Sequence, residues 1–179
     1  MSKKSQQEKF VPFQHSNLGF KNVLLNYARE SKSNEGFEYQ LASAFIYISF
    51  TEYLARHFIE NLNYIISEQS RTSFAGIIYF NKKNETKPKT LGDYIKMLED
   101  YEFPDKVAVL KLFRDINSRR NSIYHNSALN SEKEFINLVK EDITEVESKV
   151  EELLERINTV YSGLQKILSN PSSENNGTS

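Results

Sequence analysis

The chain contains no cysteine, and this absence excludes several kinds of chemistry. Disulfides, thiol nucleophiles and cysteine-ligated zinc sites all need that residue. Glycine and proline are also scarce, with 6 and 4 residues. Because turn-rich β folds use many of both, their scarcity favours a fold built mainly from helices.

An excess of charge of one sign is missing as well. The chain has 23 Lys and Arg against 24 Asp and Glu, a net charge of −1. The whole molecule therefore does not attract polyanions, and any nucleic-acid site has to be local. No apolar run reaches membrane-spanning length, and the opening "MSKKSQQEKF" lacks the apolar core of a signal peptide. We expect a cytoplasmic protein with no membrane partner.

What remains is the composition of one globular domain, with 39% hydrophobic residues in a chain of 179. We expect a flexible N-terminal segment over 1–16, a single helical domain over 17–168 and a disordered tail over 169–179. The expected fold class is all-α, a bundle of about five helices with a long C-terminal helix.

Four helices are predicted before the last one. A short helix is expected over 17–31, and residues 37–69 are apolar on most sides, as in a central helix covered by its neighbours. The segment 71–89 is ambiguous between a short strand, a helix fragment and a loop. Thr90 and Asp93 have capping-box spacing and begin the third helix. Pro104 and Asp105 are expected to begin the fourth.

The last helix has the strongest pattern. Ser131 and Glu134 form a capping box. The apolar residues after it recur at alternating steps of three and four: Ile136, Val139, Ile143, Val146, Val150, Leu153, Ile157, Val160, Leu164 and Ile167. Such a heptad is typical of a dimerising coiled coil. A long helix of a bundle is the alternative, and the further apolar residues beside the stripe favour it.

The stretch "RRNSIYHN" (119–126) gathers two arginines, an asparagine and a histidine. On a helical wheel Arg120 projects into the middle of an apolar face, within roughly 20° of its mean direction. A charge in that position is costly unless an anion compensates it. Glu52 lies on an apolar face of the central helix, so we expect it to orient Arg120. The alternative is an ordinary pair between Glu52 and Arg56.

His125 would point about 140° away from Arg120 on an unbroken helix. The two side chains can act together only if the helix breaks before His125, or if a second chain brings its own copy. An imidazole and a guanidinium that meet can cleave a phosphodiester without a metal. The imidazole moves protons, and the guanidinium stabilises the phosphoryl oxygens. Asn121 precedes His125 by four residues and would position the ring or the RNA.

These residues carry a family resemblance. An all-helical chain with "LGDYIKML", a spacer, and "INSRRNSIYHN" before a long last helix resembles the HEPN superfamily (higher eukaryotes and prokaryotes nucleotide-binding) over roughly residues 37–168. The hallmark of that family is Arg, four to six residues, then His, often with Asn directly after the Arg. Arg120 to His125 matches the four-residue form, and Arg119 to His125 the five-residue form. Asn121 and the wheel position favour Arg120.

The resemblance implies a homodimer in which two Arg/His motifs share a cleft and cleave RNA without a metal or other cofactor. It assigns catalysis to Arg120, His125 and Asn121, with Arg119 and Glu52 in support. It also implies a toxin–antitoxin or other prokaryotic defence role, with an antitoxin or a larger defence complex as a partner. Some members carry an adenylylated Tyr two residues after the His. Ser127 stands there, which puts that form of control in doubt.

Two features complete the expectations. A basic loop with Lys82, Lys83, Lys87 and Lys89 is a weak candidate for an RNA-backbone contact, and such loops are more often only solvated. The alternative to an enzyme is a catalytically inactive helical module that binds a protein partner or a nucleotide. RNA cleavage in EDTA that depends on His125 would separate the two.

Overall fold

The computed structural model describes residues 19–34, 36–73, 90–126 and 131–169. Within those ranges every regular element is a helix: α1 (Gly19–Lys32), α2 (Phe37–Ser73), α3 (Leu91–Glu99), α4 (Lys106–Asn126) and α5 (Glu132–Ser169). The predicted all-α bundle with a long C-terminal helix is confirmed. The expectations for residues 1–16, for most of 71–89 and for the tail after 169 fall on residues outside the described ranges.

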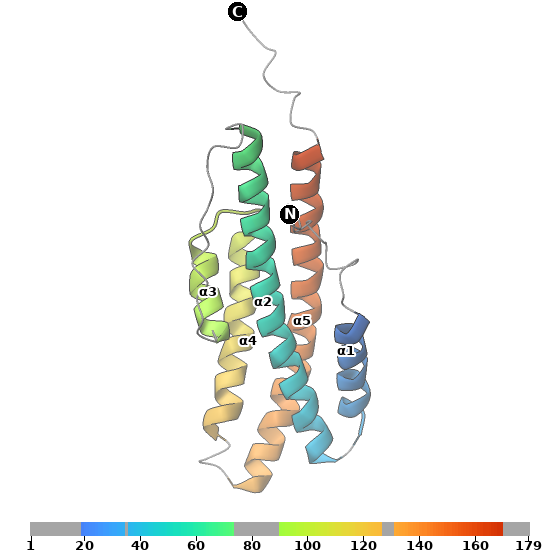
Figure 1. Ribbon diagram of the computed structural model, residues 1–179. Helices are drawn as coiled ribbons and strands as arrows, with labels where there is room; N and C mark the ends of the chain where they lie inside the picture. The colour runs from blue at the N-terminus through green and yellow to red at the C-terminus, as the bar shows by residue number, and fades with distance from the viewer. Residues whose placement is uncertain (1–18, 35, 74–89, 127–130, 170–179) are drawn as a thin grey trace, which may run out of the picture.

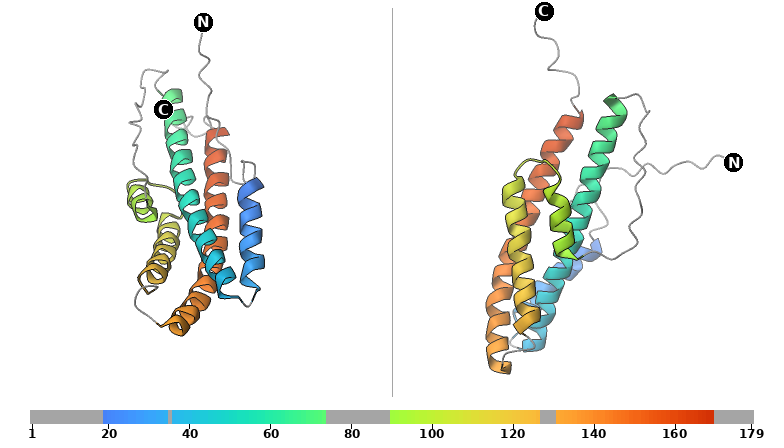
Figure 2. Two further views of the ribbon diagram at one scale, coloured as in Figure 1. Left: turned by 60° about the horizontal axis from the view of Figure 1, so that its bottom comes forward. Right: turned by 90° about the vertical axis from the view of Figure 1, so that its left-hand side faces the viewer.

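The two long helices, α2 and α5, lie side by side and form the centre of the bundle (Figure 1). On one side α1 packs against α2. On the other side α3 and α4 pack against each other and against α2, and α4 also contacts α5 (Figure 2). The end of α4 and the starts of α2 and α5 lie at the same end of the molecule (Figure 1).

The core between these helices is aromatic at its centre. Phe58 of α2 is fully buried, and its ring lies 5.0 Å from that of Phe103 and 5.5 Å from that of Tyr161. Both contacts are edge-on, the geometry that aromatic pairs prefer. The hydroxyl of Tyr161 accepts a hydrogen bond of 2.8 Å from Asn61, so a buried polar group of the core is satisfied.

The apolar stripe of α5 is buried inside this one chain. Seven of the predicted heptad positions are at most 2% exposed: Val139, Ile143, Val146, Val150, Leu153, Ile157 and Val160. They lie on a helix that packs against α2 and α4. The bundle interpretation is therefore the correct one for these residues, because the stripe covers the chain's own core instead of a second copy.

Both predicted capping boxes are present. The amide of Thr90 donates to Asp93 Oδ2 at 2.9 Å, and that of Asp93 donates to Thr90 Oγ1 at 3.4 Å. Ser131 and Glu134 bond in the same reciprocal way, and the hydrogen bonds from Ser131 hold the pKa of Glu134 below its usual range. Each box pairs amides at the start of a helix that have no partner within it.

Three helix limits differ from the sequence-based expectation. The first helix ends at Lys32 instead of Ser31, and α2 continues to Ser73. The fourth helix begins at Lys106 and not at Pro104 and Asp105. Asp105 adopts a positive φ of 60°, which removes it from the helix, while its carbonyl accepts a bond from Val109. Its carboxylate bonds Arg156 of α5 at 2.6 Å, which compensates a backbone conformation that is uncommon outside glycine.

Candidate functional site

The whole stretch "RRNSIYHN" belongs to the final turns of α4, which runs unbroken to Asn126. A helix break before His125, one of the two conditions for Arg120 and His125 to act together, does not occur. Helical geometry then points the two side chains about 140° apart. Within one chain they face different surroundings, so a shared site requires a second copy of the chain.

Arg120 lies on the buried side of α4, as the helical wheel predicts. Its neighbours on that side, Ile116 and Ile123, are at most 1% exposed, whereas its own side chain keeps 22% of its area in contact with solvent. Its Nε is buried and has no hydrogen-bond partner. Its guanidinium carbon lies 5.3 Å from the centre of the Tyr124 ring, one turn further along the helix.

Glu52 provides the anion that this position needs. Its Oε1 lies 3.5 Å from Arg120 Nη2, and the same oxygen accepts a bond of 3.3 Å from the amide of Leu91. Glu52 therefore joins α2 to both α4 and the start of α3, where a negative charge also interacts favourably with the helix dipole. The alternative partner, Arg56, lies 3.8 Å from Glu60 instead.

Arg119 is held on another side of α4. Its Nη1 donates to Asp142 Oδ1 at 2.8 Å, and its Nη2 forms an ion pair with Glu145, both on α5. Partial burial disfavours its charge, but the hydrogen bonds to Asp142 and Glu145 outweigh burial and raise its pKa above the ordinary value. Asp142 is 2% exposed, so this pair links α4 to α5 inside the protein.

The two arginines therefore differ in what remains available to a ligand. Arg119 is neutralised by two carboxylates, one of them buried. Arg120 has one carboxylate, Glu52, at 3.5 Å from Nη2; its Nε is buried and out of reach of a ligand, so its free donors are those of the two Nη groups. Of the two, Arg120 keeps more donor capacity for a phosphate.

His125 and Asn121 are both exposed, on the side of α4 that faces solvent. Their spacing of four residues places them one above the other on that side. Nearby, Asn126 Nδ2 donates to Ser122 Oγ at 3.2 Å. An exposed imidazole beside an amide is open to a substrate or to another protein surface.

Two contacts at this site were not anticipated from the sequence. One is the stack of Arg120 on Tyr124, for which the spacing of four residues was an available signal. The other is the pair of Arg119 with Asp142, a carboxylate among the buried heptad positions of α5. Asp142 was visible as a charge on an apolar stripe, but the sequence does not say which cation it meets.

The structure does not test the basic loop. Lys82, Lys83, Lys87 and Lys89 lie outside the described residues. Among the residues that are described, no three His, Asp or Glu side chains are grouped so that they could hold a metal ion. None of the helices in the described part of the chain is long and apolar enough to cross a membrane.

Comparison with known proteins adds no relative. No family model, no curated protein and no solved structure matches this chain.

Proposed function

We propose that this chain is a metal-independent endoribonuclease of the HEPN type that acts as a homodimer. The motif Arg120-Asn121-x3-His125 at the end of the helix before the last one supports the proposal, as does the all-helical bundle that carries it. The biological setting we propose is the one the resemblance implies, a prokaryotic toxin–antitoxin or other defence system.

The observation that carries the proposal is the environment of Arg120. A guanidinium within an apolar helix face, with a buried Nε that has no partner, costs stability. Such costs persist where function needs the group. The guanidinium of Arg119 has no such atom, because Asp142 and Glu145 pair with it, although Oδ2 of Asp142 is itself buried without a partner. The buried guanidinium nitrogen without a partner thus belongs to Arg120, the arginine that the motif assigns to the phosphate.

The chemistry follows from the two side chains. A neutral imidazole of His125 takes the proton of a ribose 2′-hydroxyl, and the 2′-oxygen forms a bond to phosphorus. The bond from phosphorus to the 5′-oxygen breaks, and that oxygen takes the proton back from the same imidazole, which the first step protonated. The products are a 2′,3′-cyclic phosphate and a 5′-hydroxyl. Arg120 stabilises the charge that develops on the phosphoryl oxygens, and Glu52 orients the guanidinium.

The proposed site is built from two copies of the chain. Because α4 is unbroken through His125, Arg120 and His125 of one copy diverge on the helix. The proposal needs a two-fold arrangement of the ends of two α4 helices in which His125 of one copy reaches the 22% of the Arg120 side chain that the other copy leaves in solvent. The exposed positions of His125 and Asn121 leave them accessible to such a partner.

The same divergence favours one alternative, a helical module that binds a partner protein or a nucleotide and does not cleave RNA. In that function Arg120 and Glu52 only hold α4 and α2 together through their ion pair, and Arg120 binds no phosphate. His125 then belongs to an interaction surface only.

The test is incubation of labelled single-stranded RNA with the pure protein in EDTA. Wild type is compared with His125→Ala, and with Arg114→Ala as a control for the loss of basic charge on the same helix. Arg114 is exposed and pairs with Glu99 at 2.6 Å, so its loss removes a charge without changing the proposed site. We expect cleavage by wild type and Arg114→Ala, and none by His125→Ala. An intact dimer that leaves RNA uncut, or equal cleavage by all three, would contradict the proposal.

A further inference from the structure

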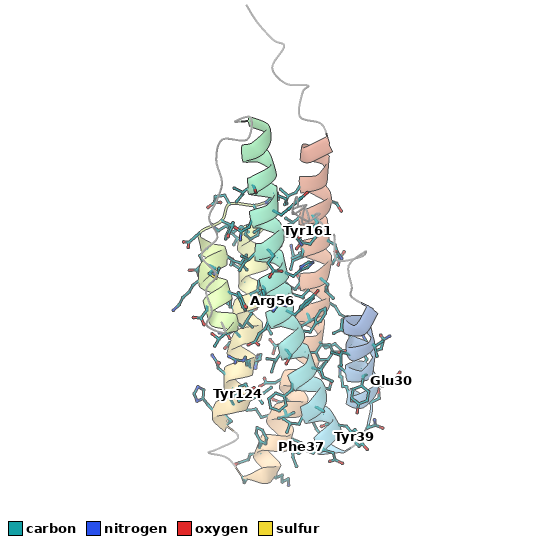
Figure 3. All side chains as sticks on the ribbon, viewed as in Figure 1. Glu30, Phe37, Tyr39, Arg56, Tyr124 and Tyr161 are labelled. Carbon is teal, nitrogen blue, oxygen red and sulfur yellow. The ribbon has the colours of Figure 1, made fainter. Side chains whose placement is uncertain are left out.

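The last turn of α4 carries an aromatic ring that the proposed chemistry does not use. Tyr124 is 48% exposed, much like Tyr27 at 50% and Tyr39 at 44%, but it lies within the motif stretch 119–126. It lies at the lower end of α4, the end of the bundle where Phe37 also lies (Figure 3). Single exposed aromatic residues are common on protein surfaces, so a binding role for Tyr124 depends on the groups beside it.

The exposed ring is held in place from the protein side. Its centre lies 5.6 Å from that of Phe45 of α2, with the two planes tilted by 52°. On the same helix, Arg120 Cζ lies 5.3 Å from the ring centre. Phe45 and Arg120 thus help to fix the ring, while about half of its surface remains in solvent. A ring fixed in this way loses little conformational freedom when a planar ligand stacks on it.

The distance along the helix suits a nucleotide. Tyr124 is four residues from Arg120, about 6 Å along the axis, and adjacent to His125. A base that stacks on Tyr124 therefore lies within one nucleotide of a phosphate bound at Arg120. Unpaired bases stack well on tyrosine rings, and every base presents a planar face.

From these contacts we infer that Tyr124 is the base-stacking residue of the site, and that it binds the nucleobase next to the phosphate at Arg120. The inference rests on the proposed ribonuclease function and adds the group that selects an unpaired nucleotide. A base inside a duplex cannot present its face to the ring, so the residue favours single strands over duplexes at this position.

The test uses the absence of tryptophan from the chain. Tyr124→Trp in the His125→Ala background introduces a single indole into a protein that leaves RNA intact. We expect a single-stranded oligoribonucleotide to quench the fluorescence of this indole. The dissociation constant from the quenching titration should equal the one measured by fluorescence anisotropy of the same oligonucleotide. Tyr27→Trp in the same background is the matched control, because Tyr27 is 50% exposed but lies on α1, which packs against α2 on the side away from α4. Its indole should not be quenched.

A second arm separates stacking from an effect transmitted through Arg120. In the His125→Ala background, Tyr124→Leu should weaken binding of the oligoribonucleotide about tenfold, and Tyr124→Phe should not. With an oligonucleotide that has abasic sugars, Tyr124→Leu should bind as well as its parent. Equal weakening for both ligands would mean that Tyr124 acts by positioning Arg120, and would overturn the inference.

The remaining outcomes distinguish this inference from the proposed function. If RNA binds by anisotropy, while the indole at 124 is not quenched and Tyr124→Leu binds normally, the stacking role is wrong and the ribonuclease proposal stands. If Tyr124→Leu converts a dimer into a monomer without RNA, the ring belongs to an interface between copies and the inference fails. If wild type neither binds nor cleaves RNA, both fail together.

Discussion

The two adjacent arginines of α4 should respond in opposite ways to the same substitution. Arg119→Met removes the cation that pairs with Asp142, whose side chain is only 3% exposed. Arg120→Met removes a guanidinium whose Nε is buried without a partner, and keeps an apolar stem in its place. We expect the first variant to lose stability and keep activity, and the second to keep stability and lose activity.

The magnitude for Arg119→Met follows from the burial of its partner. Breaking a buried ion pair costs about 3–5 kcal/mol, because the remaining charge stays desolvated. Because the Arg119 side chain is 41% exposed, water can enter part of the space that it leaves beside Asp142. We therefore expect a loss of about 3 kcal/mol in the free energy of unfolding, the lower end of that range. For a chain of this size that corresponds to a fall in Tm of about 6–12 °C. Replacing both residues, in Arg119→Met with Asp142→Leu, should recover most of the loss.

For Arg120→Met we expect a change of less than about 1 kcal/mol in the free energy of unfolding. The lost ion pair with Glu52 spans 3.5 Å and is partly solvated, and removal of the buried Nε offsets its loss. Cleavage of RNA should fall by about 100-fold or more, the usual effect of removing a donor to a developing oxyanion.

Urea unfolding followed by circular dichroism measures the first quantity, and initial cleavage rates in EDTA measure the second. Arg114→Met is the control, since its exposed pair with Glu99 should contribute no more than about 1 kcal/mol. An Arg119→Met variant as stable as Arg114→Met would refute the structural role of Arg119. A folded Arg119→Met that fails to cleave, beside an active Arg120→Met, would reverse the assignment of the two arginines.

Three further predictions concern the groups around the site and the core. Glu52→Gln keeps an oxygen that accepts from the amide of Leu91 but loses the charge that orients Arg120. The cleavage rate should therefore fall about tenfold, with little change in the free energy of unfolding in urea. An unchanged cleavage rate would exclude the orienting role. Tyr161→Phe leaves Asn61 without its buried acceptor and should cost about 1–2 kcal/mol in urea unfolding, whereas no cost would mean that water replaces the hydroxyl. Burial raises the pKa of both Tyr47 and Tyr161. The stability that comes from keeping these hydroxyls protonated is therefore complete below about pH 10 and falls as the pH rises further, by up to about 1.4 kcal/mol per pH unit for each. An absorbance titration in which all tyrosines of the folded protein ionise near pH 10 would contradict this.

The parts of the fold that the sequence predicted well depend on local signals. Both capping boxes are properties of four consecutive residues, and both formed. The stripe on α5 is a periodic pattern within one helix, and its burial followed from that pattern. What the stripe packs against was not a local property. Heptad spacing alone fits a coiled coil between chains as well as a bundle. In the structure the stripe is buried because α2 and α4 of the same chain pack against α5.

At the candidate site, too, local sequence signals predicted some contacts, whereas the packing of the helices determined the others. The position of Arg120 on a buried face came from helical periodicity, and its contact with Glu52 followed because both are charges on apolar faces. The partners of Arg119 did not follow, since several carboxylates of α5 were available and only the packing angle of α4 on α5 selects Asp142 and Glu145. The end of α4 was also open, because "HNSALNS" is prone to turns at any of its first residues and the helix includes His125 before it ends.

Central to the proposed function is one active site that combines Arg120 of one copy with His125 of another. It is tested most directly by mixing two inactive variants, Arg120→Met and His125→Ala, under conditions where dimers exchange subunits, and measuring RNA cleavage in EDTA. A mixed dimer would hold one site in which both side chains are intact. We predict that the mixture regains up to about a quarter of the wild-type rate, since half of the dimers are mixed and each has one working site of two. Wild-type cleavage beside a mixture as inactive as its two components would contradict it.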